Sequence, residues 1–291
     1  MLRKGLSSME RCTEYAFTVR LMVAILLFGG MTGAARAQSG TQSSQRDLKT
    51  IVESGVLRVA MTRFDLPPFH RMRRDGSVKG MDADFAHKLA AALNVKLVIL
   101  SDSPTFDDTV TAIVEGRADI AMSKLSQTYD RLARVRFSEP LVAWRHAMLF
   151  NRKSIAIEAS GRPPEEVLRR FKGKIGVIGA SAYVDFARQN FPSAQFFEAK
   201  SWDDAVVALR DSRVDAIYRD EFEIKRLLKL NPAMNVHFGA AMITDQVAYI
   251  SVAICDTCGK LQEFINFFIT QNKGPYTVDN ILAASLKESP K

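Results

Sequence analysis

The chain has 291 residues, of which 47% are hydrophobic and 25% are charged. This balance excludes a disordered chain, a collagen and a pure coiled coil. The length suffices for one large domain or two modest domains, each with its own core. The 40 Lys and Arg residues exceed the 32 Asp and Glu residues by eight. That surplus alone is compatible with a nucleic acid, a membrane surface, an acidic ligand or no specific partner.

Residues 1–37 have the three-part pattern of a secretory signal peptide. A basic leader precedes an apolar run at 21–28, and an alanine-rich sequence before Gln38 resembles a cleavage site. The alternative is a membrane anchor, but the stretch between Arg20 and Arg36 is shorter than the roughly 20 residues that span a bilayer. We therefore expect a cleaved signal peptide and a soluble mature protein in the periplasm.

Loss of this leader lowers the positive surplus from eight to five, because it contains five basic and two acidic residues. The sequence has no zinc-finger spacing and no Gly-aromatic RNA-binding motif. Its densest basic cluster, at 71–74, lies beside the hairpin-turn signal Asp75-Gly76. We therefore expect no nucleic-acid partner.

After a polar, flexible lead-in at 38–47, strand-like and helix-like segments alternate along the chain. This alternation indicates α/β units with mostly parallel sheets. The predicted strands are 56–61, 95–100, 119–122, 174–178, 195–197 and 214–218, and the predicted helices are 84–93, 106–115, 183–190 and 203–210.

One pattern occurs twice in the chain. A helix, a tight turn and a basic residue precede Asp119, which opens a short apolar strand, and the same order precedes Asp215. Between the two copies, 154–164 resembles a loop. Two similar α/β lobes explain this repeat better than one continuous sheet. Because such sheets bind ligands outside the carboxyl ends of their strands, the facing ends of two lobes would form a cleft.

The most informative stretch is 121–131, where a buried strand leads through a polar loop into a helix. Thr128 is the expected N-cap, and Arg131 lies in the first turn, where its charge opposes the helix dipole. A guanidinium group binds a carboxylate through two parallel hydrogen bonds. Arg131 therefore either holds an anionic ligand, with Ser126 as a further donor, or pairs with a nearby acid of the chain.

In the second lobe, small residues from Gly179 to Ala182 precede a helix, an arrangement that exposes backbone N–H groups to an anion. Most such turns are plain connections. Asp220 follows the strand at 214–218. Its carboxylate either accepts hydrogen bonds from a ligand ammonium or caps the helix at 221–230.

The loop after the first strand contains Pro67-Pro68, which fixes an extended shape. This loop presents two aromatic side chains. We expect Phe64 to pack against a ligand and Phe69 to lie in the core.

From about Leu48 to Leu286 the chain resembles the periplasmic solute-binding proteins of ABC transporters, in the family that binds polar amino acids. The order and spacing of several segments carry this resemblance, namely 55–59, 65–69, 80–84, 116–120, 125–131, 136–140, 179–183, 213–220 and 264–276. It implies the α/β clamshell of the type 2 periplasmic binding proteins, with two lobes that are each a mixed, mostly parallel sheet flanked by helices. Lobe 1 would comprise 48–144 plus 244–291 and lobe 2 would comprise 145–243, with hinge crossings near 144 and 244.

The resemblance also implies roles for individual residues. Arg131 would hold the α-carboxylate of an amino acid, Ser126 and Ser181 would donate to the same carboxylate, and Asp220 would hold the α-ammonium. Because these residues belong to different lobes, only a closed state makes every contact, so a ligand would favour closure.

Two departures from the family pattern leave the ligand class open. Lys124 stands where a small Ser or Gly is usual. It either faces the ligand's side chain, which would favour an acidic amino acid or a dicarboxylate, or points to solvent. The aromatic residue that usually stacks on the ligand has no clear counterpart, since the loop offers Phe64 and Leu66 but no Tyr.

Cys255 and Cys258 form a C-x-x-C pair. In an exported chain we expect a disulfide, which over so short a loop stiffens a turn more than it stabilises the fold. A redox role would require a lowered thiol pKa, and no thioredoxin-like pattern surrounds the pair. The four His residues are scattered, so we expect no metal site, and no cofactor motif is present.

The leading hypothesis is a monomeric, non-enzymatic periplasmic protein that binds a small carboxylate or amino acid and delivers it to an ABC transporter permease. The second hypothesis is an enzyme on the same scaffold, such as a cyclohexadienyl dehydratase, which needs a general acid. The Gly-Gly loop of those enzymes is missing at Ser123-Lys124. The third is an accessory protein of a periplasmic quinoprotein dehydrogenase system.

Overall fold

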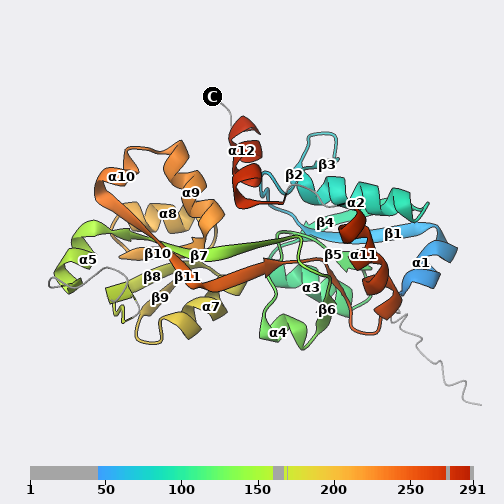
Figure 1. The fold of residues 1–291 in the computed structure, drawn as a ribbon, viewed down its shortest axis with the longest axis horizontal. Helices are drawn as coiled ribbons and strands as arrows, with labels where there is room; N and C mark the ends of the chain where they lie inside the picture. The colour runs from blue at the N-terminus through green and yellow to red at the C-terminus, as the bar shows by residue number, and fades with distance from the viewer. Residues whose placement is uncertain (1–44, 160–166, 169, 273–275, 289–291) are drawn as a thin grey trace, which may run out of the picture. The chain divides into compact units, whose positions relative to one another are not determined.

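The computed structural model describes residues 45–159, 167–168, 170–272 and 276–288. The predicted signal peptide at 1–37 lies outside the described residues. The strands are β1 Val56–Thr62, β2 Arg71–Met72, β3 Val78–Lys79, β4 Lys96–Ser103, β5 Ile120–Ala121, β6 Val135–Phe137, β7 Val142–Asn151, β8 Lys174–Ile178, β9 Gln195–Ala199, β10 Ala216–Asp220, β11 Phe238–Ile250 and β12 Ala253–Cys255 (Figure 1). The helices are α1 Leu48–Ser54, α2 Met81–Ala92, α3 Phe106–Val114, α4 Tyr129–Leu132, α5 Arg152–Ala159, α7 Ala182–Asn190, α8 Trp202–Arg210, α9 Glu221–Leu230, α10 Met234–His237, α11 Gly259–Gln271 and α12 Val278–Glu288.

The strands form two five-stranded sheets and a small hairpin of β2 and β3. In the first sheet the order is β4-β1-β5-β12-β6, with β1 parallel to β4 and β5 and with β12 antiparallel to its neighbours. Its core contains Leu57, Val59, Leu89, Ile113 and Ile120, which are inaccessible to solvent. Helices α2 and α3 pack against this sheet and supply part of that core.

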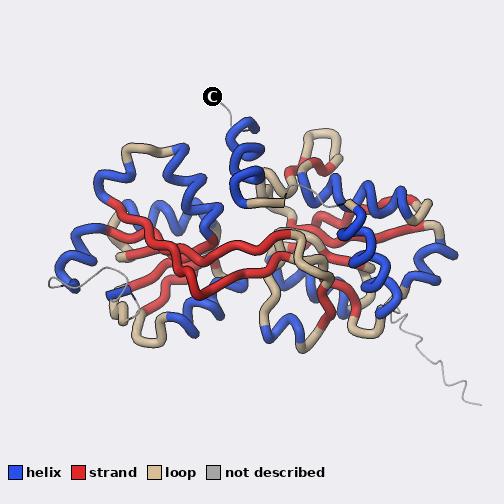
Figure 2. Tube along the Cα trace, viewed as in Figure 1, coloured by secondary structure: helices blue, strands red, loops and turns tan. Residues whose placement is uncertain are grey.

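The second sheet has the order β11-β7-β10-β8-β9 and repeats the plan of the first. Strand β8 is parallel to β9 and β10, whereas β7 is antiparallel to β10 and β11. In the first sheet β1 lies between β4 and β5, and in the second sheet β8 lies between β9 and β10. Helices alternate with strands in both units (Figure 2). The expected α/β fold with mixed sheets is therefore confirmed.

The repeated Asp residues hold corresponding places in the two sheets. The carboxylate of Asp119 accepts a hydrogen bond from Arg58 N at 2.8 Å, and that of Asp215 accepts one from Lys174 N at 2.9 Å. Asp119 therefore connects β5 to β1, and Asp215 connects β10 to β8. Asp119 additionally receives the Arg58 guanidinium at 2.7 Å.

Strands β7 and β11 pair antiparallel over most of their length, with a register shift between Ile243 and Val247. The expected crossings near 144 and 244 fall inside these two long strands. An apolar cluster at this place contains Phe69, Trp144 and Phe222 together with Ile281 and Leu282 of α12. Helix α12, which the sequence analysis assigned to lobe 1, also packs against α9.

A disulfide joins Cys255 and Cys258, whose Cα atoms are 5.2 Å apart. Both cysteines are buried, in the short turn between β12 and α11. Among the described residues, no helix is both long and apolar enough to cross a membrane.

We predict that Asp119→Ala lowers the free energy of unfolding by about 2–3 kcal/mol, because a backbone N–H and a guanidinium lose their acceptor. Urea unfolding followed by circular dichroism measures this change. The exposed Asp102 of β4 provides the control, since Asp102→Ala should change stability by less than about 0.5 kcal/mol. Equal effects of the two substitutions would contradict the proposed role of Asp119.

Candidate functional site

The loop after β5 is held in place from several sides. Ser123 Oγ accepts a hydrogen bond from Thr62 N at 2.9 Å, and Asp82 of α2 accepts one from Lys124 N at 3.1 Å. Further along, Gln127 N donates to Tyr249 O at the end of β11. These bonds fix the backbone from which two candidate cations, Lys124 and Arg131, project.

Lys124 lies in the left-handed region of the backbone map, with φ of 53°. A non-glycine residue there costs about 1–3 kcal/mol, so the surrounding hydrogen bonds must impose this conformation. The side chain is buried, and its Nζ lies 2.9 Å from Asp220 Oδ2 and 2.7 Å from Glu223 Oε1. Of the two alternatives left open for Lys124, the one in which it points to solvent is therefore wrong.

Three aromatic rings surround the same ammonium group. Lys124 Nζ lies 5.3 Å from the ring centre of Phe69 and 4.9 Å from the ring centres of both Trp144 and Phe222. At these distances the negative faces of the rings stabilise a cation. The expectation that Phe69 belongs to the core is confirmed, since its side chain is buried in the cluster with Trp144 and Phe222.

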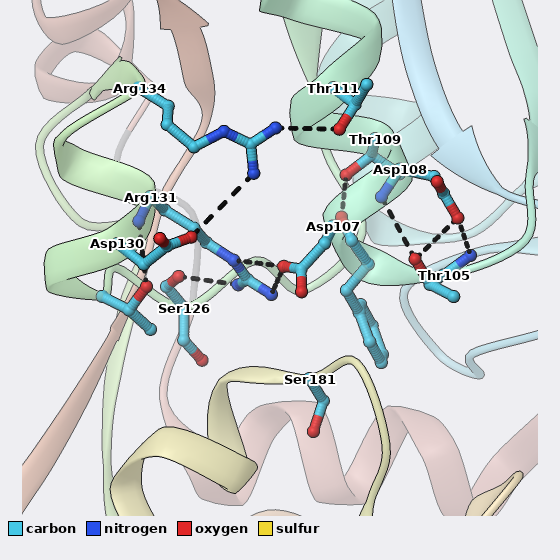
Figure 3. Close-up of polar contacts among 12 residues, drawn as sticks. Thr105, Asp107, Asp108, Thr109, Thr111, Ser126, Asp130, Arg131, Arg134 and Ser181 are labelled. Carbon is cyan, nitrogen blue, oxygen red and sulfur yellow. Dashed lines mark hydrogen bonds and ion pairs between the residues drawn. The ribbon is translucent and has the colours of Figure 1, made fainter.

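Arg131 is buried at the short helix α4, whose N-cap Thr128 accepts a hydrogen bond from Arg131 N. Its Nε and Nη2 donate to Asp107 Oδ1 at 3.0 and 2.7 Å, and its Nη1 donates to Ser126 O at 2.9 Å (Figure 3). The acid partner that the sequence analysis left open is therefore Asp107, which lies far from Arg131 in sequence. Asp107 is 43% exposed whereas the Arg131 side chain is 3% exposed, so a ligand carboxylate can replace Asp107 without stranding a buried acid.

The capping of α3 sets the place of Asp107. Thr105 accepts a hydrogen bond from Asp108 N, and the Asp108 side chain accepts one from Thr105 N, which makes a complete capping box. Asp107 lies between these two residues in the first turn. Figure 3 shows its carboxylate directed at the Arg131 guanidinium.

On the second sheet, two candidate residues lie at the starts of helices. Ser181 precedes α7, and its Oγ donates to Ile178 O at 2.6 Å. Asp220 precedes α9, and its Oδ1 accepts a hydrogen bond from Glu223 N at 3.0 Å. Asp220 therefore caps α9, which is one of the two interpretations offered by the sequence, and it also faces the ammonium group of Lys124.

Arg219 was not singled out by the sequence analysis. Its side chain is 4% exposed, and its Nε lies 3.5 Å from Asp220 Oδ2. The guanidinium lies over the rings of Phe106, Tyr183 and Trp202 at 5.9, 5.3 and 5.8 Å. A basic residue inside an otherwise buried strand was the available signal, because such a charge needs a partner.

Six of the seven predicted ligand-binding residues line one small cavity. This cavity has a volume of about 20 Å³, which is room for about one water molecule. Its walls are Phe106, Lys124, Ser126, Arg131, Ser181, Ala182, Tyr183, Arg219 and Asp220. A ligand as large as an amino acid therefore requires the walls to move apart.

The seventh predicted residue, Phe64, lines a neighbouring cavity of about 590 Å³. Its ring meets the ring of Phe106 edge-on at 5.4 Å. Phe106 and Arg219 border both cavities, and Trp202 and Glu223 line only the larger one. The larger cavity, whose walls combine apolar rings with charged side chains such as Arg63, Lys200 and Arg226, therefore adjoins the smaller one.

Behind the cavity, His146 is buried against Phe186, and its Nδ1 contacts the Tyr218 hydroxyl. Burial lowers the pKa of His146 to about 4, although the nearby charge of Asp220 acts in the opposite direction. Burial likewise raises the pKa of Tyr183 well above its usual value, and the charge of Asp220 adds to this effect. Both groups are therefore neutral near pH 7. Within the described residues, no group of three or more His, Cys, Asp and Glu side chains is placed to hold a metal.

We predict that stability falls as the pH drops from 7 to 4.5, because the folded state resists protonation of His146. In the unfolded chain this His has a pKa near 6.5, so the unfolded state binds more protons between pH 6.5 and 4. The stabilisation is complete above pH 6.5 and is lost as the pH falls towards 4. His146 should contribute about 2–3 kcal/mol to this loss.

Urea unfolding at a series of pH values, compared between variants, isolates this contribution. His146→Gln should flatten the pH dependence, whereas His87→Gln, on the exposed side of α2, should leave it unchanged. An unchanged slope in His146→Gln would show that another group is responsible.

Residues 57–229, which are more than half of the chain, match the family model described as "bacterial extracellular solute-binding proteins, family 3". The chain therefore belongs to this family. This result confirms the resemblance found in the sequence.

Relatives of the chain include both an enzyme and a binding protein. The cyclohexadienyl dehydratase of Pseudomonas aeruginosa is 28% identical over 213 residues, covering 69% of this chain and 72% of that protein. The L-cystine-binding protein TcyJ of Escherichia coli K12 is 25% identical over 213 residues, covering 72% and 73%.

The fold also matches a solved structure, the ancestral amino acid-binding protein AncCDT-1, a precursor of cyclohexadienyl dehydratase. The TM-score is 0.64 at 24% identity, covering 82% of this chain and 98% of that one. The expected two-lobed fold of a type 2 periplasmic binding protein is therefore confirmed.

One expectation needs correction. The sequence analysis took the protein to be no enzyme, and this is wrong as stated, because a 28% identical relative is a dehydratase. Membership of a solute-binding family does not exclude enzymatic activity.

Proposed function

We propose that the protein captures a small organic carboxylate between its two lobes. The observation that supports this most directly is the pair of buried arginines, Arg131 of α4 and Arg219 of β10, which line one cavity. Arginine is suited to this task, since its planar guanidinium binds carboxylates through two parallel hydrogen bonds. Ser126, Ser181 and the first turn of α7 add further donors.

Binding is coupled to closure, because the ligand contacts come from both lobes. We assign 48–144 plus 244–291 to lobe 1 and 145–243 to lobe 2, and we place the hinge in β7 and β11. A ligand that touches both lobes stabilises only the state in which they close over it. The small volume of the cavity accords with this coupling, because entry needs an open cleft.

The protein then delivers its ligand to an ABC transporter permease as a monomer in the periplasm. Family membership supports this role, as does the relative described as an L-cystine-binding protein. In this scheme residues 1–37 act as the export signal and are removed.

Isothermal titration calorimetry against amino acids and dicarboxylates tests the proposal. We expect binding of at least one acid, and we expect Arg131→Ala to weaken it by at least about 30-fold, since hydrogen bonds to charged groups contribute about 2 kcal/mol or more. Arg134→Ala is the matched control. Arg134 lies in the turn just after α4 and donates to Thr111 instead of lining the cavity (Figure 3).

Absence of binding across the panel would reject the proposal. Equal losses in the Arg131 and Arg134 variants would reject Arg131 as a ligand contact.

A dehydratase is the second candidate, favoured by the 28% identity to cyclohexadienyl dehydratase. Such a reaction needs a general acid to protonate the departing hydroxide. Glu223 is the best placed acid. It is buried, contacts Lys124 Nζ at 2.7 Å and lines the larger cavity.

Turnover of prephenate or arogenate to an aromatic product, followed by ultraviolet absorbance, tests this candidate. If the protein is a dehydratase, Glu223→Gln should lower the rate at least about 100-fold. Glu221→Gln, which alters a buried acid on the same helix that lines neither cavity, should retain the rate. Absence of turnover in the wild-type protein would reject the candidate.

A further inference from the structure

We propose that Lys124 supplies from within the chain the ammonium group that Asp220 binds, so that the cleft selects organic acids without an α-ammonium group. This inference rests on the proposed function, since it defines the ligand class of the same cleft. The ammonium position beside Asp220 is thereby filled by a side chain of the protein and not by the ligand.

The first support is the completeness of the environment around Lys124 Nζ. Two carboxylates lie within 3 Å, from Asp220 and Glu223, and three rings surround the cation at 4.9 to 5.3 Å. Aromatic rings and carboxylates are together the groups that recognise an ammonium ion. The two acids and Phe222 of lobe 2, together with Phe69 and Trp144 of lobe 1, therefore form an ammonium site, and the tip of Lys124 occupies it.

The second support is the way in which the chain places Lys124. The residue belongs to the loop after β5 of the first sheet, whereas Asp220 ends β10 of the second sheet and Glu223 lies in the helix α9 that follows. Its left-handed backbone suits glycine, yet Asp82 binds its N–H and fixes this geometry around a lysine. A strained backbone that is held so firmly indicates that the side chain is needed where it points.

The third support is the balance of charge around the cavity. Lys124, Arg131 and Arg219 face the carboxylates of Asp220, Glu223 and the half-exposed Asp107. The acids that could bind a ligand ammonium are therefore already paired with cations. The three positive and three negative charges balance, so a further ammonium would find no unpaired carboxylate to compensate the loss of its hydration in a medium that screens poorly.

The same arrangement favours anions. Asp107 can withdraw from Arg131 to solvent, which frees one guanidinium for a carboxylate. Among the described residues the buried Nε of Arg219 has no hydrogen-bond partner and makes only the 3.5 Å ion pair with Asp220, so it can serve a second anionic group. The class of ligand that fits is thus a small acid with no α-ammonium and preferably with two carboxylates.

Matched pairs of acids that differ in the α-amino group test this inference. Isothermal titration calorimetry would compare glutamate with glutarate and 2-oxoglutarate, and arogenate with prephenate, on the wild-type protein. We expect the acid without the amino group to bind at least tenfold more tightly than its amino counterpart.

The decisive variant is Lys124→Gly, which removes the internal ammonium and suits the backbone angle of this position. It should shift the preference towards the amino acid by at least tenfold. Lys124→Gln, which keeps the length of the side chain but not its charge, provides a second variant if the first is poorly folded. Lys88→Ala, an exposed lysine of α2, is the matched control and should keep the wild-type preference.

The outcomes are distinguishable. Binding of amino acids to the wild-type protein as tightly as their counterparts would overturn this inference and leave the proposed capture of carboxylates intact. An unchanged preference in both folded Lys124 variants would also overturn it. If no acid of the panel binds to any variant, the proposed function fails, and this inference fails with it.

Discussion

The ion pair of Lys124 with Asp220 and Glu223 is the contact on which the cleft depends. All three side chains are buried, and a buried charge is tolerated only when it is paired and hydrogen-bonded. Asp220 and Glu223 also lie at the N-terminal end of α9, where the helix dipole favours negative charge. Separation of the lobes therefore breaks a charge pair, although water can then solvate its members.

The loop hydrogen bonds, the backbone angle and the side-chain direction of Lys124 all favour this ion pair. Asp82 and Ser123 hold the loop, the loop imposes the left-handed backbone, and the backbone directs the side chain across to the second sheet. Trp144 of β7 and Phe222 of α9 then shield the ammonium from solvent. A change at any of these positions would alter the electrostatics of the cavity without touching a ligand.

Much of the fold was predictable because its signals are local. The pattern that contains Asp119 occurs again at Asp215 and predicted two equivalent strands, and Thr128 predicted the start of α4. The partner of Arg131 was not predictable, because Asp107 lies on another helix and is brought close only by tertiary packing. The direction of Lys124 was equally hidden, because it depends on a backbone angle that a single sequence does not reveal. Arg219 carried a signal, a charge within a buried strand, that was available and was not used.

A receptor and a dehydratase place similar demands on this cleft, which explains why one fold can serve both. Each must close over an acid, exclude water and hold carboxylates with arginine. What separates them is a proton donor directed at the bound molecule. In this chain the buried Glu223 and Lys124 contact each other at 2.7 Å and border adjoining cavities. An anion that attracts Lys124 towards itself would weaken the hold of Lys124 on Glu223 and release that carboxyl group towards the larger cavity. The interaction that fits the cleft to an acid without an ammonium group would then also control the position of Glu223, so that ligand choice and chemistry depend on the same lysine.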